Sequence, residues 1–105
     1  MDKKKILWVN EPSWKATGYS VYGKEVLSRL NQVDDFEIAE LSCYATEVDV
    51  KKNKQPWKVY ANRPDPNSPE YEEYSKNPSR IFGEHKFNDV CLDFRPDIVM
   101  DIRDW

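Results

Sequence analysis

Residues 4–30, KKILWVNEPSWKATGYSVYGKEVLSRL, decide the fold. Ile6–Val9 form a continuous apolar run, which is typical of a parallel strand covered on both faces. Pro12 and Gly18 follow this run, and the helical period after them places on one face Tyr22, Val26, Leu27, Leu30 and Val33. The stretch therefore predicts a strand, a loop and a helix that turns back over the strand. That is the opening unit of an open α/β sheet, in which the first strand-to-helix loop usually faces the ligand.

The start of the helix contains the residues that decide how it begins and packs. Thr17 or Ser20 is expected to cap it, because either hydroxyl can accept a free backbone N–H. Gly23 lies inside the apolar face, where the absence of a Cβ lets the helix approach the sheet closely. The pattern from Gly18 to Gly23-Lys24 superficially matches a phosphate-binding P-loop. We reject that interpretation because the next residue is neither Ser nor Thr and because Gly18 lies too far beyond the strand.

Two more strands are predicted in the middle of the chain. Phe36–Cys43 predicts a second strand, less apolar than the first, as expected nearer a sheet edge. Trp57–Tyr60 predicts a short third strand. Regular structure is otherwise hard to recognise between residues 44 and 80, and the prolines there predict an irregular insertion over about residues 61–80. Tyr71 and Tyr74 are compatible with a single helical turn inside it.

The last part of the chain returns to a clear pattern. A second helix is predicted over Glu84–Arg95, with one apolar face made by Phe87, Val90, Cys91 and Phe94. Pro96 ends it, and Asp97–Ile102 predicts a strongly buried strand. Right-handed crossovers then give a Rossmann-like parallel sheet in the order 3-2-1-4, with a crevice between the loops that follow its first and last strands. We expect residues 1–105 to form one domain, truncated after the fourth strand, and we expect the exposed sheet edge to promote self-association.

Composition limits the kinds of partner and the cellular location. The net charge of −3 and the interspersed acidic and basic residues predict no attraction to nucleic acid or to an anionic membrane. No apolar run is long enough to span a bilayer or to act as a secretory signal, so we expect a cytoplasmic protein. Cys43 and Cys91 are expected to be reduced core residues, and no spacing of ligands indicates a metal site.

Candidate site residues lie in the two loops that face the crevice. Gly18 either lets a ligand come close to the protein backbone or simply makes a turn, while the helix N-terminus behind it favours an anion such as a diphosphate. Asn10 and Arg103 are expected to contact substrate, although Arg103 has neighbouring aspartates with which to pair. Trp14 and Tyr19 are candidates either to stack on a sugar or base or to pack the loop onto the domain.

Three carboxylates fall at crevice positions and are the candidates for acid–base chemistry: Glu11, Asp101 and Asp104. Asp101 serves equally well as a strand residue and Asp104 as a helix cap. His85, the one histidine in the sequence, is expected on the surface in the first turn of the second helix. No nucleophile is placed by a motif to work with it. The catalytic residues are therefore unknown from the sequence.

The two ends of the chain resemble a known family. KILWVNEPSW, ATGYSVYGKEVLSRL and the later FRPDIVMDIRDW are similar to the N-terminal half of GT-B glycosyltransferases, in particular the nucleotide-sugar-dependent enzymes related to glycogen synthase and sucrose synthase. Those proteins begin with a strand, a loop ending in Gly-Tyr-Gly or similar and a helix reading like REVLRRL, and carry a later strand reading PDIV. Ser20 stands where the loop of that family has its second glycine, and residues 44–80 match no part of the family pattern.

The resemblance implies a two-domain enzyme whose N-terminal half holds mainly the acceptor and whose C-terminal half holds mainly the nucleotide-sugar. The loop after the first strand would approach the donor diphosphate through Thr17, Gly18 and Tyr19. No metal or other cofactor is expected, because a helix dipole and basic side chains stabilise the leaving diphosphate. The 105 residues alone would be inactive without the C-terminal domain. The alternative is a non-catalytic α/β module that binds a partner protein or a small anionic ligand, and a third reading is a flavodoxin-like nucleotide-binding enzyme.

Overall fold

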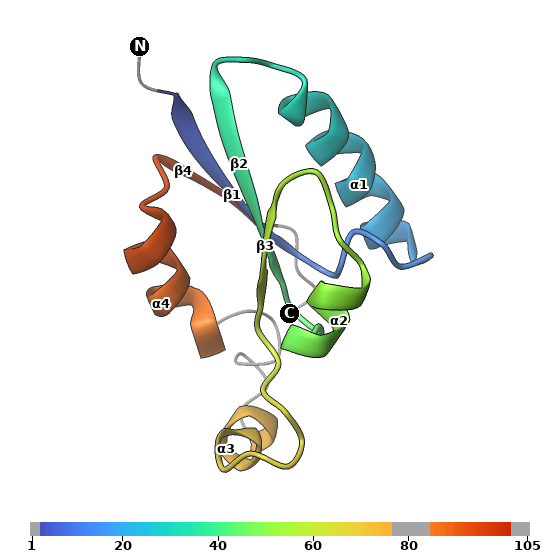
Figure 1. Ribbon diagram of the computed structural model, residues 1–105, viewed down its shortest axis with the longest axis vertical. Coiled ribbons are helices and arrows are strands. Elements are labelled where there is room, and N and C mark those ends of the chain that lie inside the picture. The colour runs from blue at the N-terminus through green and yellow to red at the C-terminus, as the bar shows by residue number, and fades with distance from the viewer. Residues whose placement is uncertain (1–2, 77–84, 102–105) are drawn as a thin grey trace.

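A four-stranded parallel sheet forms the centre of the molecule (Figure 1). The computed structural model describes residues 3–76 and 85–101. Its strands are β1 (Lys4–Asn10), β2 (Phe36–Ser42), β3 (Lys58–Ala61) and β4 (Ile98–Asp101). They pair in the order β3-β2-β1-β4, with every pair parallel. The predicted α/β class and the strand order 3-2-1-4 are both confirmed.

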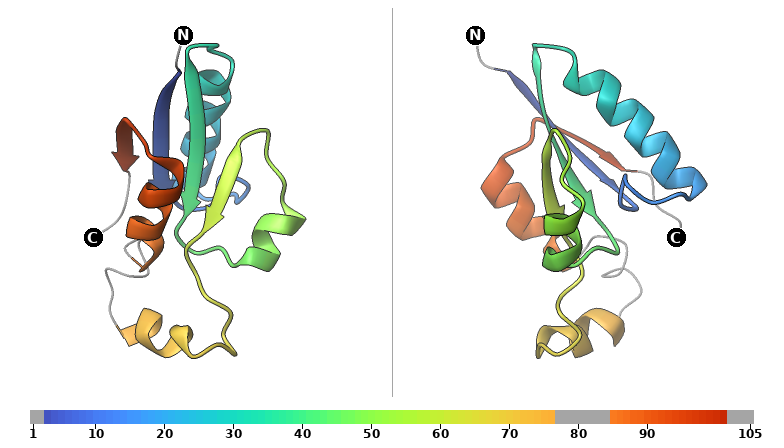
Figure 2. Two further views of the ribbon diagram at one scale, coloured as in Figure 1. Left: turned by 60° about the vertical axis from the view of Figure 1, so that its left-hand side comes forward. Right: turned by 45° about the vertical axis from the view of Figure 1, so that its right-hand side comes forward.

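The helices of the described residues are α1 (Gly18–Asn31), α2 (Glu47–Lys52), α3 (Glu70–Lys76) and α4 (His85–Phe94). Figures 1 and 2 show α1 and α4 on opposite faces of the sheet, and α3 beyond the carboxyl ends of the strands. Covering both faces explains why the first strand can be apolar throughout its centre. Successive side chains of β1 enter two different cores, one beneath each helix.

The core beneath α4 contains Leu7, Val9, Ala39, Leu41, Cys43, Val90 and Phe94. The predicted apolar face of the second helix is therefore confirmed. The core beneath α1 contains Ile6, Trp8, Leu27, Ile38 and Trp57. Two residues predicted for the apolar face of α1 lie outside this core, because Tyr22 is 55% exposed and Val33 follows the end of the helix and is 40% exposed.

The middle of the chain is more regular than predicted. Helix α2 begins with a capping box, in which the Thr46 hydroxyl accepts the Asp49 N–H and the Asp49 carboxylate accepts the Thr46 N–H. Strand β3 is shifted one residue from its predicted position. Helix α3 occupies part of the predicted irregular insertion and is longer than the single turn expected there. Residues 77–80 of that insertion lie outside the described residues.

Strand β4 differs most from its prediction. Ile98, Val99 and Met100 are 47%, 40% and 38% exposed, so the strongly buried strand predicted from their composition is wrong. The reason is position: β4 is at the edge of the sheet and pairs with β1 alone among the described strands. An apolar run therefore identified the strand correctly but not its burial.

Candidate functional site

The opening loop, residues 11–17, is anchored by a buried carboxylate that sequence reasoning missed. Glu40 lies in the centre of β2 with no exposed surface. One of its oxygens accepts the Ser13 N–H at 2.9 Å and the Ser42 hydroxyl at 2.7 Å, and the other accepts the Ser13 hydroxyl at 2.7 Å and the Trp57 indole N–H at 2.9 Å. These bonds satisfy the acceptor capacity of a group that would otherwise be costly to bury.

This network explains the lower apolar content of β2. The sequence interpretation expected lower apolar content for a strand nearer a sheet edge, and β2 does lie next to the edge strand β3, but exposure at an edge does not account for Glu40 and Ser42. Glu40 and Ser42 are instead buried and serve to hold Ser13 and Trp57. Polar residues within an otherwise apolar strand were the available signal for this buried network. An acidic residue is almost never fully buried unless its oxygens are paired, so Glu40 in such a strand indicates hydrogen-bond partners.

A second set of contacts fixes α1 against β1. Asn10 is buried, and its side-chain amide donates to the Tyr19 carbonyl at 3.0 Å. A Cβ added to Gly23 would lie 3.0 Å from the Trp8 indole nitrogen and 3.1 Å from the Asn10 amide nitrogen. The predicted role of Gly23 in close helix packing is confirmed. Asn10 can influence a ligand only through the helix start that it holds, because its own side chain is enclosed.

The helix start itself carries a chain of hydroxyl and carboxylate contacts. The Thr17 hydroxyl accepts the Ser20 N–H at 3.1 Å, so Thr17 rather than Ser20 is the N-cap of α1. The same hydroxyl donates to Glu11 in a short hydrogen bond. A carboxylate at this place is favoured by the positive end of the helix dipole. In the structure, Glu11 therefore takes the role that an anionic ligand would have at this helix.

The remaining predicted site residues lie around the same edge. Gly18 is the first residue of α1, and a Cβ there would contact nothing within 4 Å, so the space in front of it is open. Tyr19 is 46% exposed. Asp101 ends β4 opposite Val9, which places it beside the start of the opening loop, and it is exposed. Arg103 and Asp104 lie outside the described residues.

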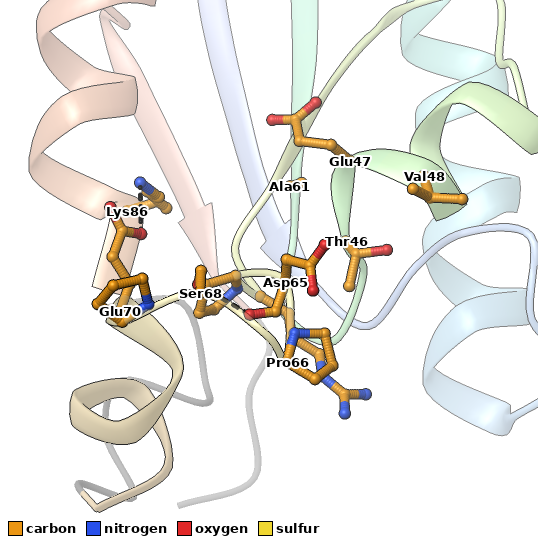
Figure 3. Close-up of a pocket in the computed structure, with 12 residues that line it drawn as sticks. Thr46, Glu47, Val48, Ala61, Asp65, Pro66, Ser68, Glu70 and Lys86 are labelled. Atoms are coloured by element: carbon orange, nitrogen blue, oxygen red, sulfur yellow. Dashed lines mark hydrogen bonds and ion pairs between the residues drawn. The ribbon is translucent and has the colours of Figure 1, made fainter.

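A separate cavity of about 420 Å³ lies at the carboxyl ends of β2 and β3 (Figure 3). We call it the proline-lined cavity, and its lining is made by residues 46–48, 61, 63–66, 68–70 and 86. Figure 3 shows Thr46, Glu47 and Asp65 on one side of it and Glu70 and Lys86 on the other. None of the predicted site residues that the structure describes lines this cavity. The irregular proline-rich tract that forms most of its wall gave no recognisable motif.

Lys86 lines the cavity from the start of α4, next to His85. His85 Nε2 and Lys86 Nζ each lie 3.4 Å from the Glu70 carboxylate. These contacts, first the one with His85, lower the pKa of Glu70 below its ordinary value. The side chain of His85 is only 8% exposed and its ring meets the Tyr74 ring edge-on, with centroids 5.6 Å apart. His85 is therefore partly buried, less exposed than the predicted surface position, because its ring packs between α3 and α4.

Within residues 3–76 and 85–101, no group of three or more His, Cys, Asp or Glu side chains is arranged to hold a metal ion. None of the helices that the structure describes is long and apolar enough to cross a membrane. Cys43 and Cys91 are reduced, and both belong to the core beneath α4, where Cys43 is buried and Cys91 is partly buried.

Comparisons with known proteins identified no relative. No protein-family model matches the chain, and neither the curated proteins nor the solved structures contain a match.

Proposed function

We propose that this chain is the acceptor-side, N-terminal domain of a GT-B-type glycosyltransferase, which moves a sugar from a nucleotide-sugar to an acceptor. The observation that carries the proposal is the adjacency of two segments that are far apart in the sequence. The strand reading IVMD pairs with β1 from Ile98 beside Ile6 to Asp101 beside Val9. The opening loop and the start of α1 follow β1 at the same edge of the sheet. These are the segments whose sequences resemble the family, and they flank the switch point where open α/β sheets bind ligands.

The chemistry at the start of α1 fits a leaving diphosphate. In the transfer, the bond between the anomeric carbon and the diphosphate oxygen breaks while an acceptor hydroxyl bonds to that carbon and loses its proton. The negative charge that develops on the diphosphate is stabilised by free N–H groups and the dipole at a helix N-terminus. Gly18 leaves open space there, and the Thr17 hydroxyl, which donates to Glu11, lies at the same helix start.

Glu11 has a defined part in this proposal. Its carboxylate holds the Thr17 hydroxyl and places a negative charge at the helix start, so a diphosphate must displace it. Removing that charge should strengthen diphosphate binding. The variant Glu11→Gln is therefore expected to bind nucleoside diphosphates several-fold more tightly, a change of roughly 1 kcal/mol.

The test is a transfer assay with the protein made from the complete coding region that contains this chain. Radiolabelled UDP-, GDP- and ADP-sugars are supplied with saccharide, lipid and peptide acceptors, and release of nucleoside diphosphate is measured in parallel. Transfer from one donor, together with tighter diphosphate binding by Glu11→Gln, supports the proposal. Diphosphate binding without transfer or donor hydrolysis would instead favour the non-catalytic binding module. If the protein binds no donor and no nucleoside diphosphate, the proposed glycosyltransferase function is excluded.

A further inference from the structure

A groove lies between the opening loop and one face of α1. We call it the loop–helix groove, and its volume of about 430 Å³ falls within the range of small-molecule sites. The loop contributes residues 13–16, and the helix contributes Val21, Lys24, Glu25 and Ser28. These four helix positions follow the spacing i, i+3, i+4 and i+7, so they lie along one face of α1.

The loop–helix groove is separate from the crevice between β1 and β4. Its loop part is attached to β2, because the Ser13 N–H and hydroxyl both donate to the Glu40 carboxylate. Strand β2 pairs with β1 on the side opposite to β4. Neither Thr17 nor Gly18 lines the groove. A ligand in the groove would therefore not occupy the place that we propose for a diphosphate at the helix start.

One part of the groove wall is apolar. Trp14 is half-buried, so part of its indole surface stays accessible, and Val21 beside it in the lining is 54% exposed. The Ala16 methyl group adds to this wall. A tryptophan ring offers a large flat surface against which an aromatic ring can stack. The wall therefore favours a flat, rigid ring over a flexible chain, which would lose more conformational entropy on binding.

The rest of the wall carries an excess of positive charge. Lys15 and Lys24 line the groove, and neither has an ion pair in the part of the chain that the structure describes. Among the described residues, Glu25 contributes the one carboxylate of the lining, and it lies 3.5 Å from Arg29. The Glu25 charge therefore has its own partner, whereas the two ammonium groups are available to an anion.

The combination of an apolar wall and two lysines argues against several classes of ligand. Inorganic phosphate would pair with the lysines but leave the apolar wall in water. A neutral ring would cover the wall but gain nothing from the charges, and a cation would be repelled by them. A nucleic acid would be repelled by the net charge of −3 on the whole chain. A small aromatic acid matches both parts of the lining.

We propose that the loop–helix groove binds a small aromatic carboxylate. The aromatic ring stacks on Trp14 and packs against Val21, and the carboxylate pairs with Lys15 and Lys24. The inference goes beyond the proposed function and does not rest on it, because no sugar, acceptor or diphosphate takes part in the binding.

The experiment is a titration of the ¹⁵N-labelled chain followed by amide NMR. The probes are 2-naphthoate and indole-3-acetate, each compared with its neutral amide, together with inorganic phosphate and the tripeptide acetyl-Gly-Gly-Phe. We expect saturable shifts at the amides of residues 13–16 and 21–28 with at least one of the two acids. An acid that binds should do so about fivefold more tightly than its amide, and phosphate should cause no saturable shift.

Variants separate the groove from the general charge of the molecule. Lys15→Met/Lys24→Met should weaken binding of the acid about fivefold, because an exposed ion pair contributes little by itself. The matched control is Lys51→Met/Lys52→Met, which removes two exposed lysines of α2 outside the lining and changes the net charge equally. The control should bind as the wild type does. Trp14→Leu should also weaken binding, through the loss of stacking surface.

Several results would overturn the inference. No saturable shift with either acid, an amide that binds as tightly as its acid, or equal losses in the two double variants would each do so. Stronger binding of the tripeptide would replace the small acid by a peptide terminus and overturn the assignment. If a variant does not fold, the wild type is titrated at about 0.02 M and 0.5 M NaCl, because salt screens ion pairs. The affinity for the acid should fall with salt while that for the amide stays the same, and an affinity for the acid that is independent of salt would overturn the inference.

Discussion

Replacement of Glu40 by glutamine should break the hydrogen bonds that hold the opening loop to β2, although the two side chains have nearly the same shape. Each Glu40 oxygen accepts one N–H donor, from the Ser13 backbone on one side and from the Trp57 indole on the other. Neither of these N–H groups can turn to become an acceptor. A glutamine amide has one carbonyl oxygen and one NH₂ group, so in either orientation its NH₂ faces an N–H.

The magnitude follows from these contacts. An unsatisfied buried donor costs about 1–3 kcal/mol, and a hydrogen bond to a charged group contributes about 1.5–3 kcal/mol. Part of the loss is offset because glutamine carries no charge to be desolvated. We therefore expect Glu40→Gln to lower the free energy of unfolding by about 3 kcal/mol, a large share of the stability of a small domain. The Ser13 amide should lose its protection from hydrogen exchange at the same time.

A double-mutant cycle with Trp57→Phe separates this mechanism from a general packing defect. Phenylalanine removes the indole N–H, and the glutamine NH₂ can then turn toward the vacated side, where the Ser13 hydroxyl can accept a hydrogen bond. Glu40→Gln should accordingly cost about 1 kcal/mol in the Trp57→Phe background, giving a coupling of about 2 kcal/mol.

Urea unfolding followed by circular dichroism measures all four proteins, with Glu37→Gln as a control on the same strand that should change stability by less than about 0.5 kcal/mol. An equal cost of Glu40→Gln in both backgrounds would refute the donor-conflict mechanism. A cost below about 1 kcal/mol in the wild type would show that the network does not anchor the loop.

Three further predictions concern the helices and their pH dependence. In urea unfolding, Gly18→Ala should raise the unfolding free energy by about 0.5 kcal/mol, since the added Cβ meets nothing. Gly23→Ala should lower the unfolding free energy by about 1–3 kcal/mol, because the added Cβ presses on Trp8. Equal effects of the two substitutions would contradict the packing role of Gly23. Burial raises the pKa of Tyr74 to about 12, above the unfolded-state value of 10.0. The free energy of unfolding should therefore be unaffected by this group below pH 10.0 and should decline as pH rises from there toward 12. Tyr74→Phe should remove that decline in thermal melts at alkaline pH. The hydrogen bond from the Thr46 N–H lowers the pKa of Asp49 below its ordinary 3.8. Asp49→Ala should therefore lower the free energy of unfolding by about 1 kcal/mol at neutral pH, and by progressively less as pH falls through the folded-state pKa of Asp49. A loss of unfolding free energy that stays constant in acid would show that the ionised Asp49 carboxylate does not cap the helix.

The sequence by itself predicted the α/β class, the strand order and the presence of the first helix, while leaving Thr17 and Ser20 as alternative caps. Ile6–Val9 and the helical spacing after Thr17 are local signals, because a strand buried on both faces and an amphipathic helix each leave their own period. Right-handed crossover connections then limit such units to a few strand orders, of which 3-2-1-4 is one. For the same reason the packing role of Gly23 and the apolar face of α4 could be predicted from residues within one helix.

Only the tertiary structure decided which polar groups meet and which apolar groups stay exposed. Glu40 contacts Ser13 and Trp57, which are 27 and 17 residues away, and the cavity gathers residues from Thr46 to Lys86. No local period records such distances. The apolar strand β4 is exposed because burial depends on its neighbours in the sheet rather than on its own residues. Composition fixes what a segment can bury, while topology fixes what lies against it.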